Sequence, residues 1–229
     1  MASLVLLLCQ PLHAGELPPA FTANYILKKF GATVAKATFE LRYEDNRVIY
    51  ESITKTTGML SLIRNDVVTE YSVLENTCPE PRLVEIFFEH QGGKPERNVH
   101  AFIDWNRKEA SITRADKTEK RPITAPLWDP FSVKLALMRD AGKSDGPLEY
   151  TLLNRNKLEI YSFTTQGKES IKHQGKNLIA LKLEGKREES KRRTVVWLAP
   201  TMNYMPLRIE QYRDDKLDVA SELVDVRWN

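Results

Sequence analysis

Three runs of sequence near the C-terminus decide the fold: Arg192-Arg193-Thr194-Val195-Val196-Trp197-Leu198-Ala199-Pro200, Tyr204-Met205-Pro206-Leu207-Arg208-Ile209-Glu210-Gln211-Tyr212 and Leu217-Asp218-Val219-Ala220-Ser221-Glu222-Leu223. Each run is rich in residues that suit strands, and in the second run apolar side chains recur at every other position. Short connections separate the runs. They therefore predict three consecutive strands that end and lock a sheet.

The same alternation continues upstream of these runs. In residues 34–43, apolar side chains occupy the odd positions from 39 to 43 and polar side chains occupy the even positions, as expected for a strand with one buried face. Further strands are predicted at 21–27, 48–57, 67–74, 83–90, 98–105, 109–113, 119–123, 148–153, 158–165, 169–173 and 178–183. Short strands at regular intervals favour a single antiparallel β domain.

One helix is expected, at residues 130–141. Asp129 can cap it through its carboxylate, Pro130 suits the first helical position, and Gly142 suits the C-terminal cap. Its apolar face is broad, so the helix should lie against the sheet or across an open end of it. The expected fold is therefore all-β, mainly a single antiparallel meander that forms a strongly curved open barrel or half-barrel, with one α-helix against or across it.

Two groups of apolar side chains could line a ligand site. One group lies in the connection 58–63, which breaks the strand alternation, and the other lies on the predicted helix and just before it. A concave apolar surface is a common ligand site, although the connection could equally plug one end of the sheet. The candidate ligand-binding residues are Met59, Leu60, Leu62, Trp128, Phe131, Leu135 and Met138.

The first 14 residues differ from the rest of the chain. The apolar run Leu4-Val5-Leu6-Leu7-Leu8 is too short to span a bilayer, which takes about 20 residues. Such a run before Ala14 is typical of a secretory signal peptide, although no Lys or Arg precedes it. We therefore expect residues 1–14 to be a signal peptide and 15–229 a single β domain, exported to the periplasm without a transmembrane anchor. The alternative is a buried N-terminal strand.

The charges are evenly spread along the chain. The net charge is only +3, and the two signs are interleaved along the predicted strands. A nucleic-acid-binding protein normally gathers positive charge on one face, so no nucleic-acid partner is expected. The densest charged run, at residues 186–193, mixes both signs and is best explained as a solvated hairpin tip.

We find no catalytic motif and no metal-ligand cluster in the sequence. Beyond the predicted signal peptide the histidines are His90, His100 and His173, whereas a zinc site needs three or four convergent ligands. A nucleophile elbow and a phosphate-binding glycine loop are both missing. Cys78 would be the single cysteine left after cleavage, so it cannot form an internal disulfide. We predict no enzymatic activity, no metal and no cofactor.

Four segments carry a family resemblance: Phe21-Thr22-Ala23-Asn24-Tyr25 with Gly31; Thr56-Thr57-Gly58-Met59-Leu60; Asp129-Pro130-Phe131-Ser132 with Leu135-Ala136-Leu137-Met138-Arg139; and Ser190-Lys191-Arg192-Arg193-Thr194 with Trp197-Leu198-Ala199-Pro200 and Tyr204-x-Pro206-x-Arg208-Ile209-Glu210. Over residues 21–228 the chain resembles the DUF3108 family of exported bacterial proteins. The resemblance implies an exported, mostly antiparallel β protein and brings no assigned activity. The expected fold is also loosely similar to that of the periplasmic lipoprotein carriers LolA and LolB, which is a similarity of fold alone.

Two hypotheses for function remain open at this point. The first is a non-enzymatic periplasmic protein that binds or carries an apolar ligand, a lipid or a lipoprotein acyl chain, in the concave face of the sheet. The second is a structural or assembly factor of the cell envelope that contacts other proteins through sheet edges or the hairpin at 185–193. A hydrolase is a third alternative and would require a cleft with perturbed carboxylates or histidines.

Overall fold

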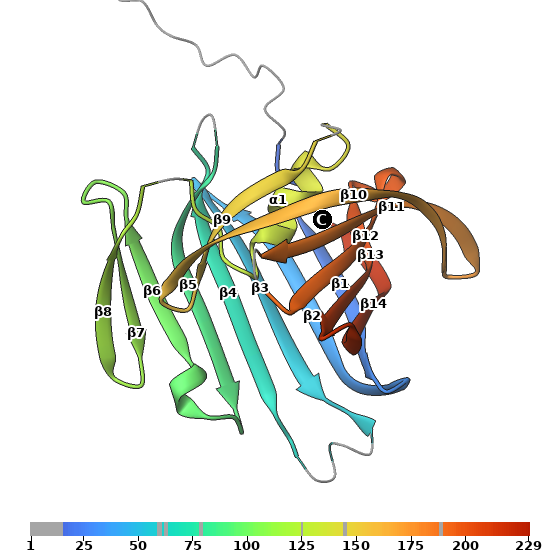
Figure 1. Ribbon diagram of the computed structural model, residues 1–229, viewed down its shortest axis with the longest axis horizontal. Helices are drawn as coiled ribbons and strands as arrows, with labels where there is room; N and C mark the ends of the chain where they lie inside the picture. Colours follow the sequence, from blue (N-terminus) through green and yellow to red (C-terminus); the bar gives the residue numbers. More distant parts are fainter. Residues whose placement is uncertain are drawn as a thin grey trace, which may run out of the picture.

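The computed structural model describes residues 16–58, 61, 64–77, 80–124, 126–143, 146–187 and 190–229. Within these ranges, fourteen strands form one sheet with a single α-helix beside it (Figure 1). The elements are β1 (Phe21–Lys29), β2 (Ala32–Glu44), β3 (Arg47–Thr56), β4 (Val67–Glu75), β5 (Arg82–Gln91), η2 (Pro95–Arg97), β6 (Val99–Asp104), β7 (Glu109–Arg114), β8 (Lys117–Pro122), α1 (Val133–Asp140), β9 (Leu148–Asn154), β10 (Lys157–His173), β11 (Lys176–Arg187), β12 (Arg192–Ala199), η3 (Pro200–Met202), β13 (Met205–Arg213) and β14 (Lys216–Trp228).

The sheet is antiparallel and stays open. Its order is β8-β7-β6-β5-β4-β3-β2-β1-β14-β13-β12-β11-β10-β9, so β8 and β9 are the two edges and do not pair with each other. The first and last strands lie side by side at its centre, where Phe21 is opposite Trp228. The structure thus confirms an all-β fold with one antiparallel, strongly curved and unclosed sheet.

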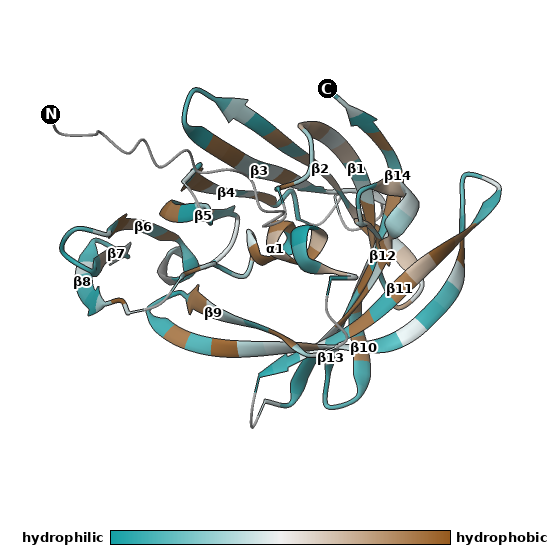
Figure 2. Cartoon of the chain, turned by 90° about the horizontal axis from the view of Figure 1, so that it is seen from above, coloured by the Kyte–Doolittle hydropathy of each residue, from teal (hydrophilic) through white to brown (hydrophobic). Residues whose placement is uncertain are grey.

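The helix lies inside the curve of the sheet. Seen from above, α1 is surrounded by the N-terminal strands on one side and by β9 to β13 on the other (Figure 2). Alternate residues of β1 turn inward, and Phe21, Ala23 and Tyr25 are all buried there. The core therefore sits between the concave face and the helix, and burial of the inward-facing apolar side chains stabilises the curved sheet.

The helix begins later than the sequence predicts. Residues 130–132 form a turn, because the Asp129 carboxylate accepts hydrogen bonds from the backbone N–H groups of Phe131 and Ser132, both at 3.0 Å. Ser132 is the residue before the helix, so the prediction that Pro130 begins it was wrong. The prediction that the Asp129 carboxylate caps the helix is confirmed by these two bonds, and the Asp129 carbonyl also accepts the Val133 N–H at 3.0 Å. The C-terminal prediction is closer: Gly142 follows Ala141 with a φ of 81°, the left-handed conformation that glycine adopts readily.

The predicted strands at 158–165 and 169–173 are one strand, β10. The register against β11 shifts between Thr165 and Gly167, and Gly167 has a φ of 116°. A bulge at a glycine bends the strand without ending its pairing. The prediction of two strands was wrong because the polar residues at this bulge resemble a turn in sequence.

Candidate functional site

A cavity of about 420 Å³ lies between α1 and the concave face of the sheet. Its walls come from strands of both halves of the sheet and from the helix. Leu27 and Phe39 of the N-terminal half and Val196 and Ile209 of the C-terminal half are among the lining residues. A pocket of roughly 300–1,000 Å³ that is mainly apolar is typical of a small-molecule site. This cavity is the candidate ligand site.

One face of the helical segment lines the cavity. Its residues are Pro130, Val133, Lys134, Leu137 and Met138, which follow the three-and-four spacing of a helix face. The opposite face packs into the core, where Leu135 and Ala136 are fully buried. The helix therefore separates a packed core from the cavity.

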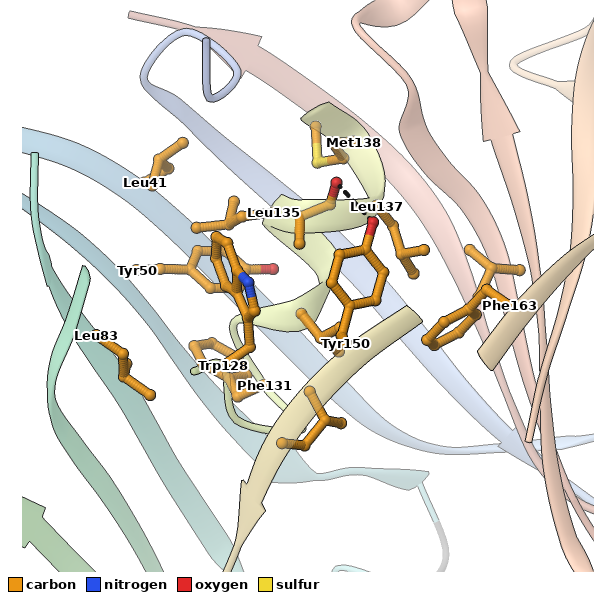
Figure 3. Packing of buried hydrophobic residues seen from close by; sticks show 14 of the residues in the cluster. Leu41, Tyr50, Leu83, Trp128, Phe131, Leu135, Leu137, Met138, Tyr150 and Phe163 are labelled. Carbon is orange, nitrogen blue, oxygen red and sulfur yellow. Dashed lines mark hydrogen bonds between the residues drawn. The ribbon is translucent and has the colours of Figure 1, made fainter. Parts of the chain in front are cut away.

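The structure divides the candidate ligand-binding residues into three groups. Met138 lines the cavity. Trp128, Phe131 and Leu135 are buried in the core around the helix and are not among the residues that line the cavity (Figure 3). Met59, Leu60 and Leu62 lie outside the described residues, as does Cys78.

Trp128 and Phe131 have positions that explain their burial. The Trp128 backbone N–H donates to Thr151 O at 3.0 Å, and Leu153 N–H donates to Trp128 O at 2.8 Å, so this segment pairs with the edge of β9. The Phe131 ring stacks on Tyr50 with a centroid distance of 4.3 Å. These two aromatic residues fix the start of the helix against strands on both sides of the molecule.

Ionisable side chains in the cavity wall were missed by the sequence analysis. Glu70 of β4 and Lys134 of α1 both line the cavity. Burial raises the pKa of Glu70, and the positive charge of Lys134 opposes this rise. Burial also lowers the pKa of Lys134, against the attraction of Glu70 and Asp129. Both side chains keep some accessible surface, which they direct toward the cavity.

A signal for these residues was present in the sequence. Glu70 lies on the same face of β4 as Ser72 and Leu74, which are both fully buried. Lys134 lies four residues before Met138 on the predicted apolar face of the helix. A charged residue on the same face of an element as buried apolar residues indicates either an ion pair or a polar group that contacts a ligand.

Asp129 is a second carboxylate near Lys134, and its oxygens are already bound. Its Oδ1 accepts a hydrogen bond from Ser72 Oγ at 2.9 Å and another from Ser132 N, and its Oδ2 accepts one from Phe131 N. The Ser132 hydroxyl also contacts it. Asp129 is therefore a structural group that ties the helix to β4.

The two arginines at one end of the cavity differ from the apolar interior. Arg192 and Arg213 are register partners at the ends of β12 and β13, and both are exposed. In the part of the chain that the structure describes, neither has a carboxylate within ion-pair distance. Their neighbour Arg193 is bound to Glu184 and lies over the Tyr212 ring. Arg193 also lies 3.6 Å from Asp215, and Asp218 lines the cavity as well, so this end carries charges of both signs and is cationic in sum.

The histidines and acidic residues form pairs rather than clusters. His90 Nε2 lies 3.3 Å from Asp66 Oδ2, and His100 Nε2 lies 2.8 Å from Glu85 Oε1. Among the described residues, no group of three or more His, Cys, Asp or Glu side chains could hold a metal ion. The search for a membrane-spanning helix, restricted to the same residues, found none that is long and apolar enough.

Comparison with solved structures shows the same fold in a distant protein. The chain is similar to the β-barrel-like protein of the domain of unknown function DUF1849 from Brucella abortus, with a TM-score of 0.63 and 9% identity over 94% of this chain and 99% of that chain. A putative exported protein with a YmcC-like fold from Bacteroides fragilis matches with a TM-score of 0.35 and 13% identity, over 93% of this chain and 98% of that one. At 9% identity the likeness to the Brucella abortus protein concerns the fold alone.

Comparison with known sequences gives a family and no activity. None of the curated proteins matches the chain. The family model described as "Protein of unknown function (DUF3108)" matches residues 20–216, which is most of the chain and includes the helix and strands β1 to β13. The protein therefore belongs to the DUF3108 family.

Proposed function

We propose that this protein is exported to the periplasm and binds an apolar ligand, a lipid or a lipoprotein acyl chain, in the cavity between α1 and the concave face of the sheet. The observation that carries the proposal is the cavity itself, about 420 Å³ in volume and walled largely by apolar side chains. Each methylene that moves from water into such a site contributes roughly 0.8 kcal/mol to binding. An acyl chain would gain this energy along its length.

The fold supports a binding role because the cavity is built from the centre of the sheet. The helix rests against the core through its buried face, so the cavity beside it keeps its shape without a ligand. A preformed apolar site costs little conformational entropy on binding. The signal peptide predicted at residues 1–14 would deliver the protein to a compartment bounded by two membranes, where lipid must cross water.

The first test is to purify the protein from periplasm and to analyse it by native mass spectrometry and lipid extraction. We expect a co-purifying lipid in a stoichiometric complex. The variant Thr194→Trp places an indole in the cavity wall and should reduce the bound lipid several-fold. Thr164→Trp is the matched control, because Thr164 is exposed on β10. Lipid-free protein that also fails to bind added acyl chains would refute the proposal.

A further inference from the structure

Polar side chains of β3, β4 and α1 meet at one place beside the cavity. Ser52 of β3 is the register partner of Glu70 of β4, and Tyr50 lies on the same face of β3. Lys134 reaches this place from the helix, and its Nζ lies 4.4 Å from the centroid of the Phe131 ring, which stacks on Tyr50. Burial raises the pKa of Tyr50, and the nearby Tyr25, Glu70 and Asp129 raise it further. The four polar ends therefore share one site.

Two polar ends at this site, Tyr50 Oη and Lys134 Nζ, have no partners of their own among the described residues. Ser52 Oγ is buried and approaches the Glu70 carboxyl, whose pKa it lowers as a hydrogen-bond donor. The described residues offer no hydrogen bond to Tyr50 Oη and no carboxylate within ion-pair distance of Lys134 Nζ. Buried polar groups are nearly always satisfied, so unpaired ones in a cavity wall point to something that fills the cavity.

The positive charge of Lys134 favours an anion as that missing partner. The Lys134 ammonium group can only donate hydrogen bonds. It lies over the rings of Phe131 and Phe39 in cation–π contacts, and these rings are not conventional hydrogen-bond acceptors. Asp129 is occupied by backbone and serine donors. Lys134 and Tyr50 together form a donor set that faces the cavity.

From this arrangement we infer that the cavity takes a hydrocarbon chain that ends in a carboxylate, and that Lys134 binds the carboxylate with Tyr50 as a second donor. The inference rests on the proposed function and deepens it by naming the ligand class. If each heavy atom of the chain takes roughly the 30 Å³ of a water molecule, a cavity of about 420 Å³ holds a ligand of about fourteen heavy atoms. Dodecanoate has this size.

The test compares dodecanoate with methyl dodecanoate, both titrated into delipidated protein and followed by calorimetry. The two ligands share the chain, and the ester lacks the charge. We expect dodecanoate to bind more tightly, and Lys134→Met to weaken dodecanoate binding by about tenfold or more, the effect of losing a hydrogen bond to a charged group. The same substitution should leave ester binding nearly unchanged, because methionine keeps the apolar stem.

The matched control is Lys36→Met, since Lys36 is exposed on β2 beside the cavity residue Ala37. Thermal unfolding of each variant checks that it is folded. If both ligands bind with the same affinity and Lys134→Met changes neither affinity, water is the partner of Lys134. The inference then fails, while the proposed function stands. If Arg192→Gln with Arg213→Gln removes the preference for carboxylate instead, the head group lies at the cationic end and the inference fails. If neither ligand binds, the proposed function fails with it.

Discussion

Glu70 is a residue that places an ionisable group in the cavity wall and lowers the free energy of unfolding at neutral pH. Its carboxyl is surrounded by protein, and burial raises its pKa despite the nearby Lys134. Below about pH 4, the ordinary pKa of glutamate, the carboxyl is protonated in both the folded and the unfolded chain and carries no penalty. As the pH rises through the raised pKa of the folded state, the unfolded chain releases its proton more easily, and the free energy of unfolding falls.

Glu70→Gln should therefore be more stable than the wild type at neutral pH, and the two should converge near pH 3. Urea unfolding at a series of pH values measures this difference. Glu149→Gln serves as the control for the chemical change, because Glu149 is exposed on β9. A Glu70→Gln variant that is less stable than the wild type at neutral pH would show that Glu70 is needed as an anion.

Gly185 shows a second residue requirement, which arises from packing. A Cβ atom added to this glycine would lie 2.2 Å from the ring of Phe163, its register partner in β10. The Phe163 ring is buried and cannot move freely. Gly185→Ala should therefore destabilise the fold by about 1–3 kcal/mol, the usual effect of overpacking. In a Phe163→Leu background the same substitution should cost clearly less, and equal costs in both backgrounds would contradict this explanation.

At the scale of elements, the helix depends on the carboxylate that precedes it. Asp129 joins Ser72 of β4 to the turn before α1, and its side chain is buried. Asp129→Ala would leave the backbone N–H groups of Phe131 and Ser132 unsatisfied, at a cost of about 3 kcal/mol or more, because each buried donor left unpaired costs roughly 1–3 kcal/mol. Chemical denaturation measures this loss, and near-ultraviolet circular dichroism reports on Trp128.

Asp104 provides the matched comparison for Asp129. Its carboxylate also accepts two backbone hydrogen bonds, from Asn106 and Arg107, but in an exposed turn between β6 and β7. Water can replace these bonds, so Asp104→Ala should cost only about 1 kcal/mol or less. Similar losses for the two variants would mean that the buried position of Asp129 does not matter.

The strands could be predicted from the sequence because their alternation is local information. Period-2 patterns located the strands of the sheet, and they failed at Gly167, where a bulge resembles a turn. The site was harder to predict. Met138 lines the cavity, but Phe131 and Leu135 face the core, because the side of the helix that meets the sheet depends on tertiary packing. Glu70 and Lys134 meet across 64 residues of sequence, which no local pattern reveals.

At the scale of the whole molecule, the open sheet must protect its two edges. The β9 edge is partly covered, because the segment at Trp128 pairs with it. The β8 edge, Lys117–Pro122, is exposed at every position and carries charged side chains and a terminal proline. Lysine and proline on an edge strand oppose the addition of a strand from another molecule. The β8 edge is therefore protected by its composition.

Replacing Lys117 and Lys120 by valine should remove this protection and promote self-association through β8. Light scattering after size-exclusion chromatography should show a mass that rises with protein concentration. The control is Lys36→Val with Lys55→Val, because these two exposed lysines face each other on the central strands β2 and β3, whose backbone groups are already paired. This control variant adds the same apolar surface on strands that are already paired on both sides, so its mass should not rise over the same concentrations. Equal association of the two double variants would assign the effect to hydrophobic surface alone rather than to strand addition.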